Sequence, residues 1–145
     1  MWSEVAHVQL NSQRLNARWI IASDYVKGPW VLRFKASGRW EPFGGFQCDP
    51  DGTSGFPLAA ERMVVTKGAP GCLIGKLGGS SASLDETGST LFAIGSYAVI
   101  AVPDKFAGPL FVGFNLERSQ IGLQIISLDV LVEADSWPFP PPPSQ

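Results

Sequence analysis

The sequence predicts an all-β fold, a single β-sandwich, from three observations. Glycine and proline are frequent, with 16 and 12 among 145 residues, and both residue types mark turns between short elements. Several segments alternate apolar and polar side chains with a period of two, which is typical of half-buried strands. A convincing helical pattern is missing from the sequence, where the best candidate, residues 57–62, is little more than one turn long.

Residues 1–16, with Ala6, Val8 and Leu10 on one face, predict a first strand or an extended arm, and the next strands are predicted at residues 18–22 and 30–36. The third of these has the clearest alternation, and Gly28-Pro29 before it and Ser37-Gly38 after it mark its ends. Its apolar face carries Trp30, Leu32, Phe34 and Ala36, and its polar face carries Arg33 and Lys35.

Short apolar segments separated by turn residues predict the remaining strands. Seven or eight short strands joined by regular turns are typical of a sandwich or barrel. The last segment alternates only in part, which predicts a β-bulge within it. We therefore expect residues 1–134 to form one sandwich domain. The later strands are predicted at residues 72–79, 91–95, 97–102, 110–115 and 123–133.

Residues 39–62 contain a long loop in which aromatic side chains alternate with Gly, Pro and Asp. A long loop inside a compact domain is usually functional or mobile. Trp40 could stack on a sugar or a protein partner, and Asp49 and Asp51 could bind the same ligand. Two alternatives stay open: the aromatic side chains cap the open end of the sandwich, and the aspartates form local turns.

Residues 135–145 form a proline-rich tail, which is expected to be an extended polyproline II segment outside the sheets. Proline lacks the N–H group that a β-ladder needs, so the tail is not expected to join a sheet. Trp137 and Phe139 are candidate anchors that dock the tail on a neighbouring subunit or partner. The alternative is a frayed terminus.

The overall charge argues against two classes of partner. The net charge is −2 and the pI is about 5.3, whereas nucleic acids and anionic membranes attract basic surfaces. The first residues lack the pattern of a signal peptide, and no apolar run is long enough to span a membrane. We expect cytoplasmic synthesis, and the protein could become part of a particle or leave the cell by a non-classical route.

Cys48 and Cys72 are the only cysteines, so they could form one disulfide or remain two buried thiols. Free thiols are favoured because the sequence shows no export signal. His7 is the only histidine, and a surface position is expected for it rather than the role of a catalytic base. The acidic residues in the loops are better explained as turn formers than as an acid–base pair, so we do not expect an enzyme.

Four short segments, each weak as a motif by itself, occur in an order that together indicates a resemblance to a known family. The set comprises Gly28 to Trp40 ending in Ala36-Ser37-Gly38-Arg39-Trp40, then Cys48-Asp49-Pro50-Asp51-Gly52, Cys72-Leu73-Ile74-Gly75-Lys76-Leu77-Gly78, and Gly108-Pro109-Leu110-Phe111-Val112-Gly113-Phe114-Asn115. In this order they resemble the galactose-binding lectins of the LecA (PA-I) type, over roughly residues 18–133. The resemblance implies a small jelly-roll-like, galactose-binding-like sandwich.

The resemblance also implies a calcium ion held by an Asn-Asp pair and a following Asn-rich loop. Here Asn115 is followed by Leu116, which cannot ligate calcium, and the next residues contain no Asn. We therefore expect neither a metal nor another cofactor. A metal-independent site would combine the loop around Asp49 and Asp51 with Trp40, Asn115, Glu117 and Gln120.

Two hypotheses from different classes follow. In the first, the protein is a non-enzymatic, lectin-like module that recognises carbohydrate or protein without calcium. In the second, it is a structural subunit of a virion or other large assembly that keeps the scaffold and has lost sugar binding. Both predict carbohydrate or protein subunits as partners and membership of an oligomer or larger complex.

Overall fold

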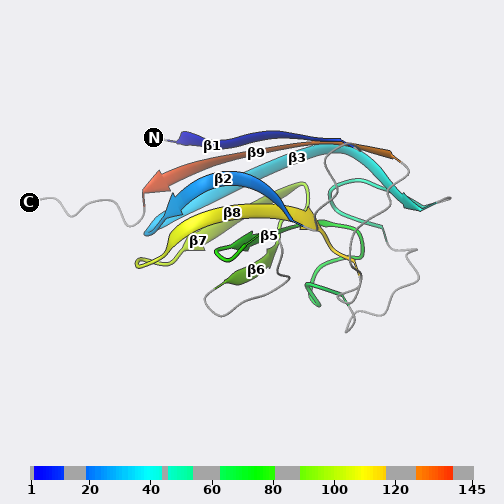
Figure 1. The fold of residues 1–145 in the computed structure, drawn as a ribbon. Coiled ribbons are helices and arrows are strands. Elements are labelled where there is room, and N and C mark those ends of the chain that lie inside the picture. Colours follow the sequence, from blue (N-terminus) through cyan, green and yellow to red (C-terminus); the bar gives the residue numbers. More distant parts are fainter. Residues whose placement is uncertain are drawn as a thin grey trace, which may run out of the picture.

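A computed structural model of the chain describes residues 2–11, 19–43, 46–53, 63–80, 89–116 and 127–138. The described strands form two antiparallel sheets that face each other (Figure 1), and none of the described segments is helical. The predicted all-β sandwich is confirmed. The five-stranded sheet has the order β1 (Ser3–Asn11), β9 (Ser127–Pro138), β3 (Trp30–Phe43) and β4 (Phe46–Cys48), and β7 (Tyr97–Val102) also pairs with β3. The four-stranded sheet has the order β2 (Ile20–Lys27), β8 (Ala107–Phe114), β5 (Leu73–Leu77) and β6 (Thr90–Ala93).

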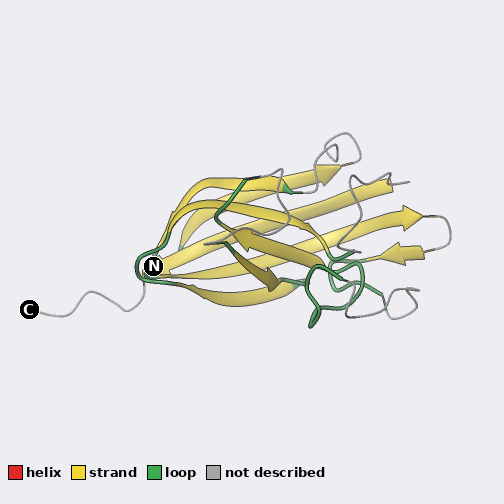
Figure 2. Ribbon diagram, turned by 60° about the horizontal axis from the view of Figure 1, so that its bottom comes forward, coloured by secondary structure: helices red, strands yellow, loops and turns green. Residues whose placement is uncertain are grey.

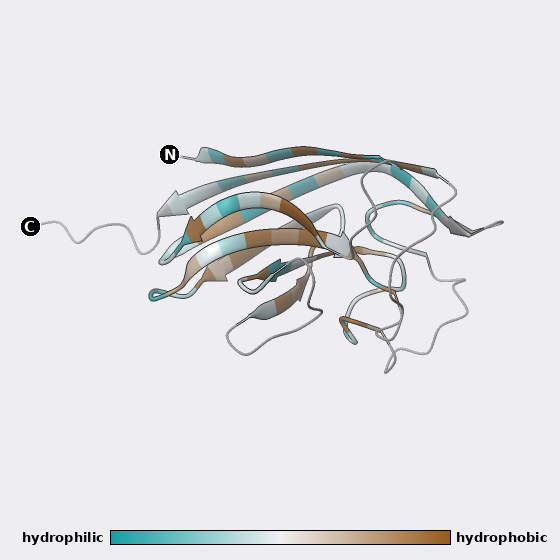
Figure 3. Cartoon of the chain, viewed as in Figure 1, coloured by the Kyte–Doolittle hydropathy of each residue, from teal (hydrophilic) through white to brown (hydrophobic). Residues whose placement is uncertain are grey.

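The core lies between the two sheets and is built by alternating side chains. Hydrophobic and polar residues alternate along β3 and its neighbours (Figure 3), so every second side chain points inward. Burying these apolar side chains is the main source of stability, at about 25 cal/mol per Å² of surface removed from water. The fully buried inward side chains include Leu10, Leu32, Phe34, Leu73, Leu110, Val112, Val130 and Val132.

Strand β5 is buried on both faces, which explains its continuous apolar sequence. Its inward side chains join the core, whereas Ile74 points to the outer face of the four-stranded sheet. There it packs in a second cluster with Trp19, Val64, Cys72 and Phe111. Lys76 is also buried on this side, where its Nζ donates a hydrogen bond to the carbonyl of Ser80 at 2.6 Å and lies 5.1 Å from the Phe111 ring centre.

Strand β3 corrects the predicted position of the long loop. The sequence predicts that a strand ends at Ser37-Gly38, but β3 continues to Phe43 and pairs with β9 up to Glu41. Gly38 has φ of 119°, and a Cβ there would lie 2.0 Å from the carbonyl oxygen of Asp129. Glycine is therefore required for the strand to continue, rather than for a turn. The helix candidate at residues 57–62 lies outside the described residues.

The last strand also differs from the prediction. Strand β9 reaches Pro138, beyond residue 134, where the sandwich domain was predicted to end. Pro138 is the last residue of the strand, so its missing N–H interrupts no further pairing. The bulge predicted within residues 123–133 is absent from residues 127–133, which pair with β3 in regular register, and residues 123–126 lie outside the described residues. A bulge lies in the partner strand β1: Glu4 pairs with Asp135 and Ala6 with Ala134, leaving Val5 as the extra residue. Phe139 and the rest of the predicted tail lie outside the described residues.

Both cysteines are free and buried, as predicted. Burial raises the pKa of each thiol to about 11, with a smaller contribution from Asp49 at Cys48. The thiolate is the reactive form, so we expect neither cysteine of the folded protein to react quickly with a disulfide reagent at pH 8. Thiol titration with Ellman's reagent should detect both thiols only in denaturant. Rapid labelling of either thiol in buffer alone would contradict their burial.

Candidate binding site

The four ligand-binding candidates that the structure describes, Trp40, Asp49, Asp51 and Asn115, lie at one end of the sandwich. The loop at residues 49–53 lies against the loop at residues 63–72, away from the N-terminus (Figure 2). The backbone N–H of Leu73 donates to the carbonyl of Pro50 at 2.8 Å, and that of Thr53 donates to Pro70 at 3.0 Å. We refer to these two segments together as the loop end.

Trp40 lies in the core at the loop end. Its side chain is 1% exposed, its ring stacks on Phe114 with a centroid distance of 4.1 Å, and its Nε1–H donates to the carbonyl of Gly71 at 3.0 Å. In contrast to the expectation from the sequence, Trp40 offers no ring face to a ligand. The alternation of β3 carries the signal that was missed, since Trp40 lies on the same face as Leu32 and Phe34.

Asn115 is used by the fold itself. Its side chain is 0% exposed, and its Oδ1 accepts a hydrogen bond from the backbone N–H of Val65 at 2.8 Å. Its Nδ2 donates to the carbonyls of Val65 and Ala69 at 2.9 and 3.1 Å. The amide therefore fastens the 63–72 segment to the end of β8. Leu116, which follows it, is also buried. Asn115 thus has no polar group directed at an external ligand, contrary to expectation.

The two aspartates form local links. Asp49 accepts a hydrogen bond from the backbone N–H of Asp51 at 2.8 Å, which is an Asx-turn. Asp51 accepts from the backbone N–H and the hydroxyl of Ser96, at 2.7 and 2.8 Å. It therefore ties the loop end to the turn between β6 and β7. Asp49 is exposed, and the other two candidates, Glu117 and Gln120, lie outside the described residues.

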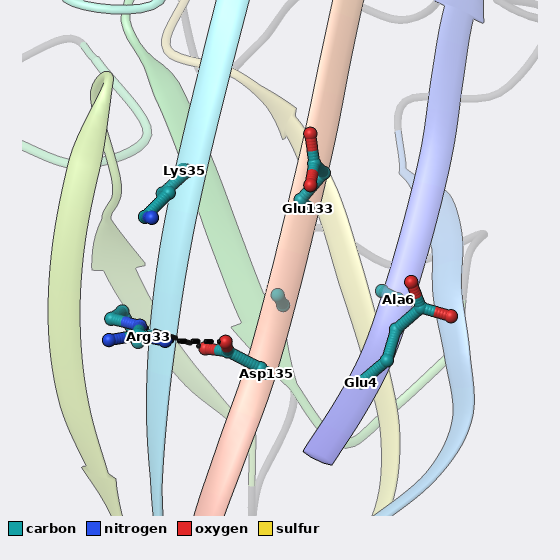
Figure 4. A pocket seen from close by; sticks show the side chains of 7 residues that line it. Glu4, Ala6, Arg33, Lys35, Glu133 and Asp135 are labelled. Atoms are coloured by element: carbon teal, nitrogen blue, oxygen red, sulfur yellow. Dashed lines mark hydrogen bonds and ion pairs between the residues drawn. The ribbon is translucent and has the colours of Figure 1, made fainter. Parts of the chain in front are cut away.

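A different set of charged side chains lines a hollow on the outer face of the five-stranded sheet (Figure 4). We call it the sheet-face hollow, and its volume is about 140 Å³. The hollow is lined by Glu4 and Ala6 of β1, Glu133, Ala134 and Asp135 of β9, and Arg33 and Lys35 of β3.

The charges of the hollow are arranged by strand register. Arg33 lies opposite Asp135, and Lys35 lies opposite Glu133. The guanidinium of Arg33 makes a bidentate ion pair with Asp135, with N–O distances of 3.1 and 2.7 Å. Hydrogen bonding to this carboxylate raises the pKa of Arg33. The pair is partly exposed, so its main effect is to hold both groups in a fixed orientation rather than to add much stability.

Two tryptophans lie beside the Arg33–Asp135 pair, outside the set of residues that line the hollow. The guanidinium of Arg33 lies over the ring of Trp2, 4.1 Å from its centre, and Trp2 meets Trp137 edge to face at 5.7 Å. Trp137, one of the predicted anchors, is 37% exposed. An oriented ion pair thus lies beside an exposed aromatic surface. Sequence alternation placed Arg33 and Lys35 on one polar face, but could not show that β9 and β1 lie next to it.

In the described part of the chain, no three His, Cys, Asp or Glu side chains gather in a way that could hold a metal ion. A helix long and apolar enough to cross a membrane was not found among the same residues.

The fold resembles a lectin β-sandwich of known structure. One solved structure that it resembles is described as the EclA N-terminal domain, a PllA-like lectin, with 17% sequence identity and a TM-score of 0.56. The match covers 92% of this chain and 98% of that one. No family model and no curated protein matches the sequence. The likeness supports a lectin-like fold without singling out the LecA-type family.

Proposed function

We propose that the protein is a non-enzymatic carbohydrate-binding module that uses the sheet-face hollow to hold a sugar without calcium. The observation that carries the proposal is a hollow lined by exposed carboxylates and a lysine, with an exposed tryptophan beyond its Arg33–Asp135 end. Glu4 and Glu133 can accept hydrogen bonds from sugar hydroxyls, and Lys35 can donate to them. The ring of Trp137 offers an apolar surface for the C–H face of a sugar.

The size of the hollow limits the ligand. Its volume of about 140 Å³ is below the range of about 300–1,000 Å³ that is usual for small-molecule pockets. A single sugar unit fits this size better than an oligosaccharide does. Further units of a glycan would lie across the exposed surface of the sheet, where Tyr97 is paired with Lys35 in the neighbouring strand.

A second candidate function is that of a structural subunit. Large apolar side chains are exposed on both sheets, and exposed apolar surface often marks protein contacts. This observation favours a protein partner as an addition to, or a replacement for, sugar binding. The exposed side chains are Ile21, Tyr25, Tyr97, Val99 and Trp137.

The test is a glycan array followed by calorimetric titration with the best glycan. We expect binding to persist in the presence of a chelator and to weaken by about tenfold in Glu133→Gln, because a hydrogen bond to a charged group is lost. Trp137→Ala should weaken it as well.

Ile21→Ala is the control, since it removes an exposed apolar side chain from a hollow that shares no residue with the sheet-face hollow. Its affinity for the glycan should equal that of the wild type. The proposal would be overturned if no glycan on the array bound, or if binding disappeared in the presence of the chelator. Full affinity in Glu133→Gln would show that the sheet-face hollow is not the binding site.

A further inference from the structure

A groove runs along one side of the sandwich, where the edge strands of the two sheets approach each other. It consists of two adjoining hollows of about 290 and 450 Å³ that share Val5, Ser23 and Tyr25. Val5 is the extra residue of the β1 bulge, and a bulge turns a side chain away from its regular direction. We call this the edge groove. Its remaining lining residues are Ser3, Glu4, Ile21, Ala22, Asp24, Trp30 and Ser136.

The groove is lined by aromatic side chains with small polar residues between them. Tyr25 is 58% exposed, and Trp30 is partly buried beside it. The hydroxyl of Ser23 donates to the carbonyl of Tyr25 at 3.2 Å, which supports the local backbone. Grooves lined by aromatic rings are the usual receptors for polyproline II segments, because rigid proline rings pack between the aromatic rings at little entropic cost.

The chain itself supplies such a segment next to the groove. Ser136 lines the groove, and Pro138, the last residue of β9, pairs with Trp30. The sequence then continues as Phe139-Pro140-Pro141-Pro142-Pro143-Ser144-Gln145, outside the described residues. In a polyproline II conformation, residues 139–145 could reach about 22 Å at about 3.1 Å per residue.

The direction of β9 favours docking of residues 139–145 in the groove of another molecule rather than in that of the same chain. Strand β9 runs antiparallel to β1 and ends beside Ser3, so a segment that keeps the direction of β9 leads beyond the ends of the strands of its own sheet. Proline runs are stiff over several residues, which opposes a sharp reversal into the groove of the same chain. We propose that residues 139–145 of a second copy dock in the edge groove, in a reciprocal exchange that closes a twofold dimer.

The proposal is tested on the full chain by sedimentation velocity over a range of protein concentrations. The wild type should show a monomer–dimer equilibrium. Tyr25→Ala should raise the dimer dissociation constant by about tenfold or more, as is typical for loss of an aromatic anchor. Replacing the proline run (Pro140→Gly, Pro141→Ser, Pro142→Gly, Pro143→Ser) should have a similar effect. Tyr97→Ala is the matched control, because Tyr97 is also 58% exposed but lies away from the groove, and its dimer should be unchanged.

A mixing experiment separates exchange between copies from docking within one chain. The Tyr25→Ala chain keeps its proline run, and the proline-replaced chain keeps its groove. Mixing the two should restore a heterodimer held by one contact, weaker than the wild-type dimer. A wild type that stays monomeric, or a dimer that survives proline replacement, would overturn the proposal. The edge groove shares Glu4 with the sheet-face hollow, but neither variant changes Glu4, Glu133 or Trp137, so the glycan titration and the dimer measurement can fail separately.

Discussion

Replacing Asn115 with alanine is expected to lower the free energy of unfolding by about 3 kcal/mol, because an unpaired buried N–H costs about 1–3 kcal/mol and each further lost hydrogen bond costs about 1 kcal/mol. The N–H of Val65 loses its acceptor, whereas the carbonyls of Val65 and Ala69 keep the N–H groups of Gly68 and Cys72 as donors, both at 3.2 Å. Urea unfolding, followed by circular dichroism and tryptophan fluorescence, measures the loss. The 63–72 segment should also become the first site of proteolytic cleavage.

Asn115→Asp serves as the companion variant because it preserves the size of the side chain. It keeps the acceptor for Val65 but places a second oxygen against two carbonyls, so it should be destabilised to a similar extent at neutral pH. If Asn115→Ala retained its stability within about 1 kcal/mol, the structural role assigned to this amide would be wrong, since losses of that size are ordinary for surface changes.

Trp40→Ala is expected to cost about 5 kcal/mol, because large aromatic truncations in a core cost about 3–5 kcal/mol and a carbonyl also loses its donor. That loss is comparable with the whole stability of many domains, so the variant is expected to be largely unfolded. Trp40→Phe keeps a ring against Phe114 but leaves the Gly71 carbonyl without its partner. It should fold, with a stability lower by about 2 kcal/mol.

The control for both Trp40 variants is Trp137→Ala, which removes the same residue type from an exposed position. Thermal and urea unfolding should show a loss of less than about 1.5 kcal/mol, which corresponds to the edge-to-face contact with Trp2. In glycan titrations the order should reverse: Trp40→Phe should bind normally, and Trp137→Ala should bind weakly. If Trp40→Phe had normal stability but did not bind the glycan, Trp40 would be a ligand-binding residue after all.

Much of the fold could be predicted because alternation reports which face of a strand is buried. It located the strand around Leu32 and Phe34, as well as the continuous apolar segment that became β5. It failed at Gly38, where a glycine that permits close approach to Asp129 looks the same in the sequence as a glycine that ends a strand. The end of β9 was missed for a related reason, since a terminal proline does not interrupt a ladder.

The candidate site was harder to predict because it depends on neighbours far apart in the chain. The sheet-face hollow joins Glu4, Arg33 and Asp135, and periodicity gives the orientation of each side chain but not the order of the strands. The loop residues were misjudged because composition alone does not distinguish a polar side chain that binds a ligand from one that satisfies the backbone. Asn115 and Asp51 are both of the second kind.

The hydrophobic cluster on the outer face of β5 and β8 makes the two outer faces of the sandwich different from each other. Val64 and Trp19, which belong to no strand, pack against Ile74 and Phe111, so the outer face of β5 and of the adjoining part of β8 is covered by the protein's own chain. Anything that approaches from there meets a covering segment held by the amide of Asn115. Attachment to a surface through this covered side would leave the opposite sheet, with Arg33 and Trp137, pointing outward.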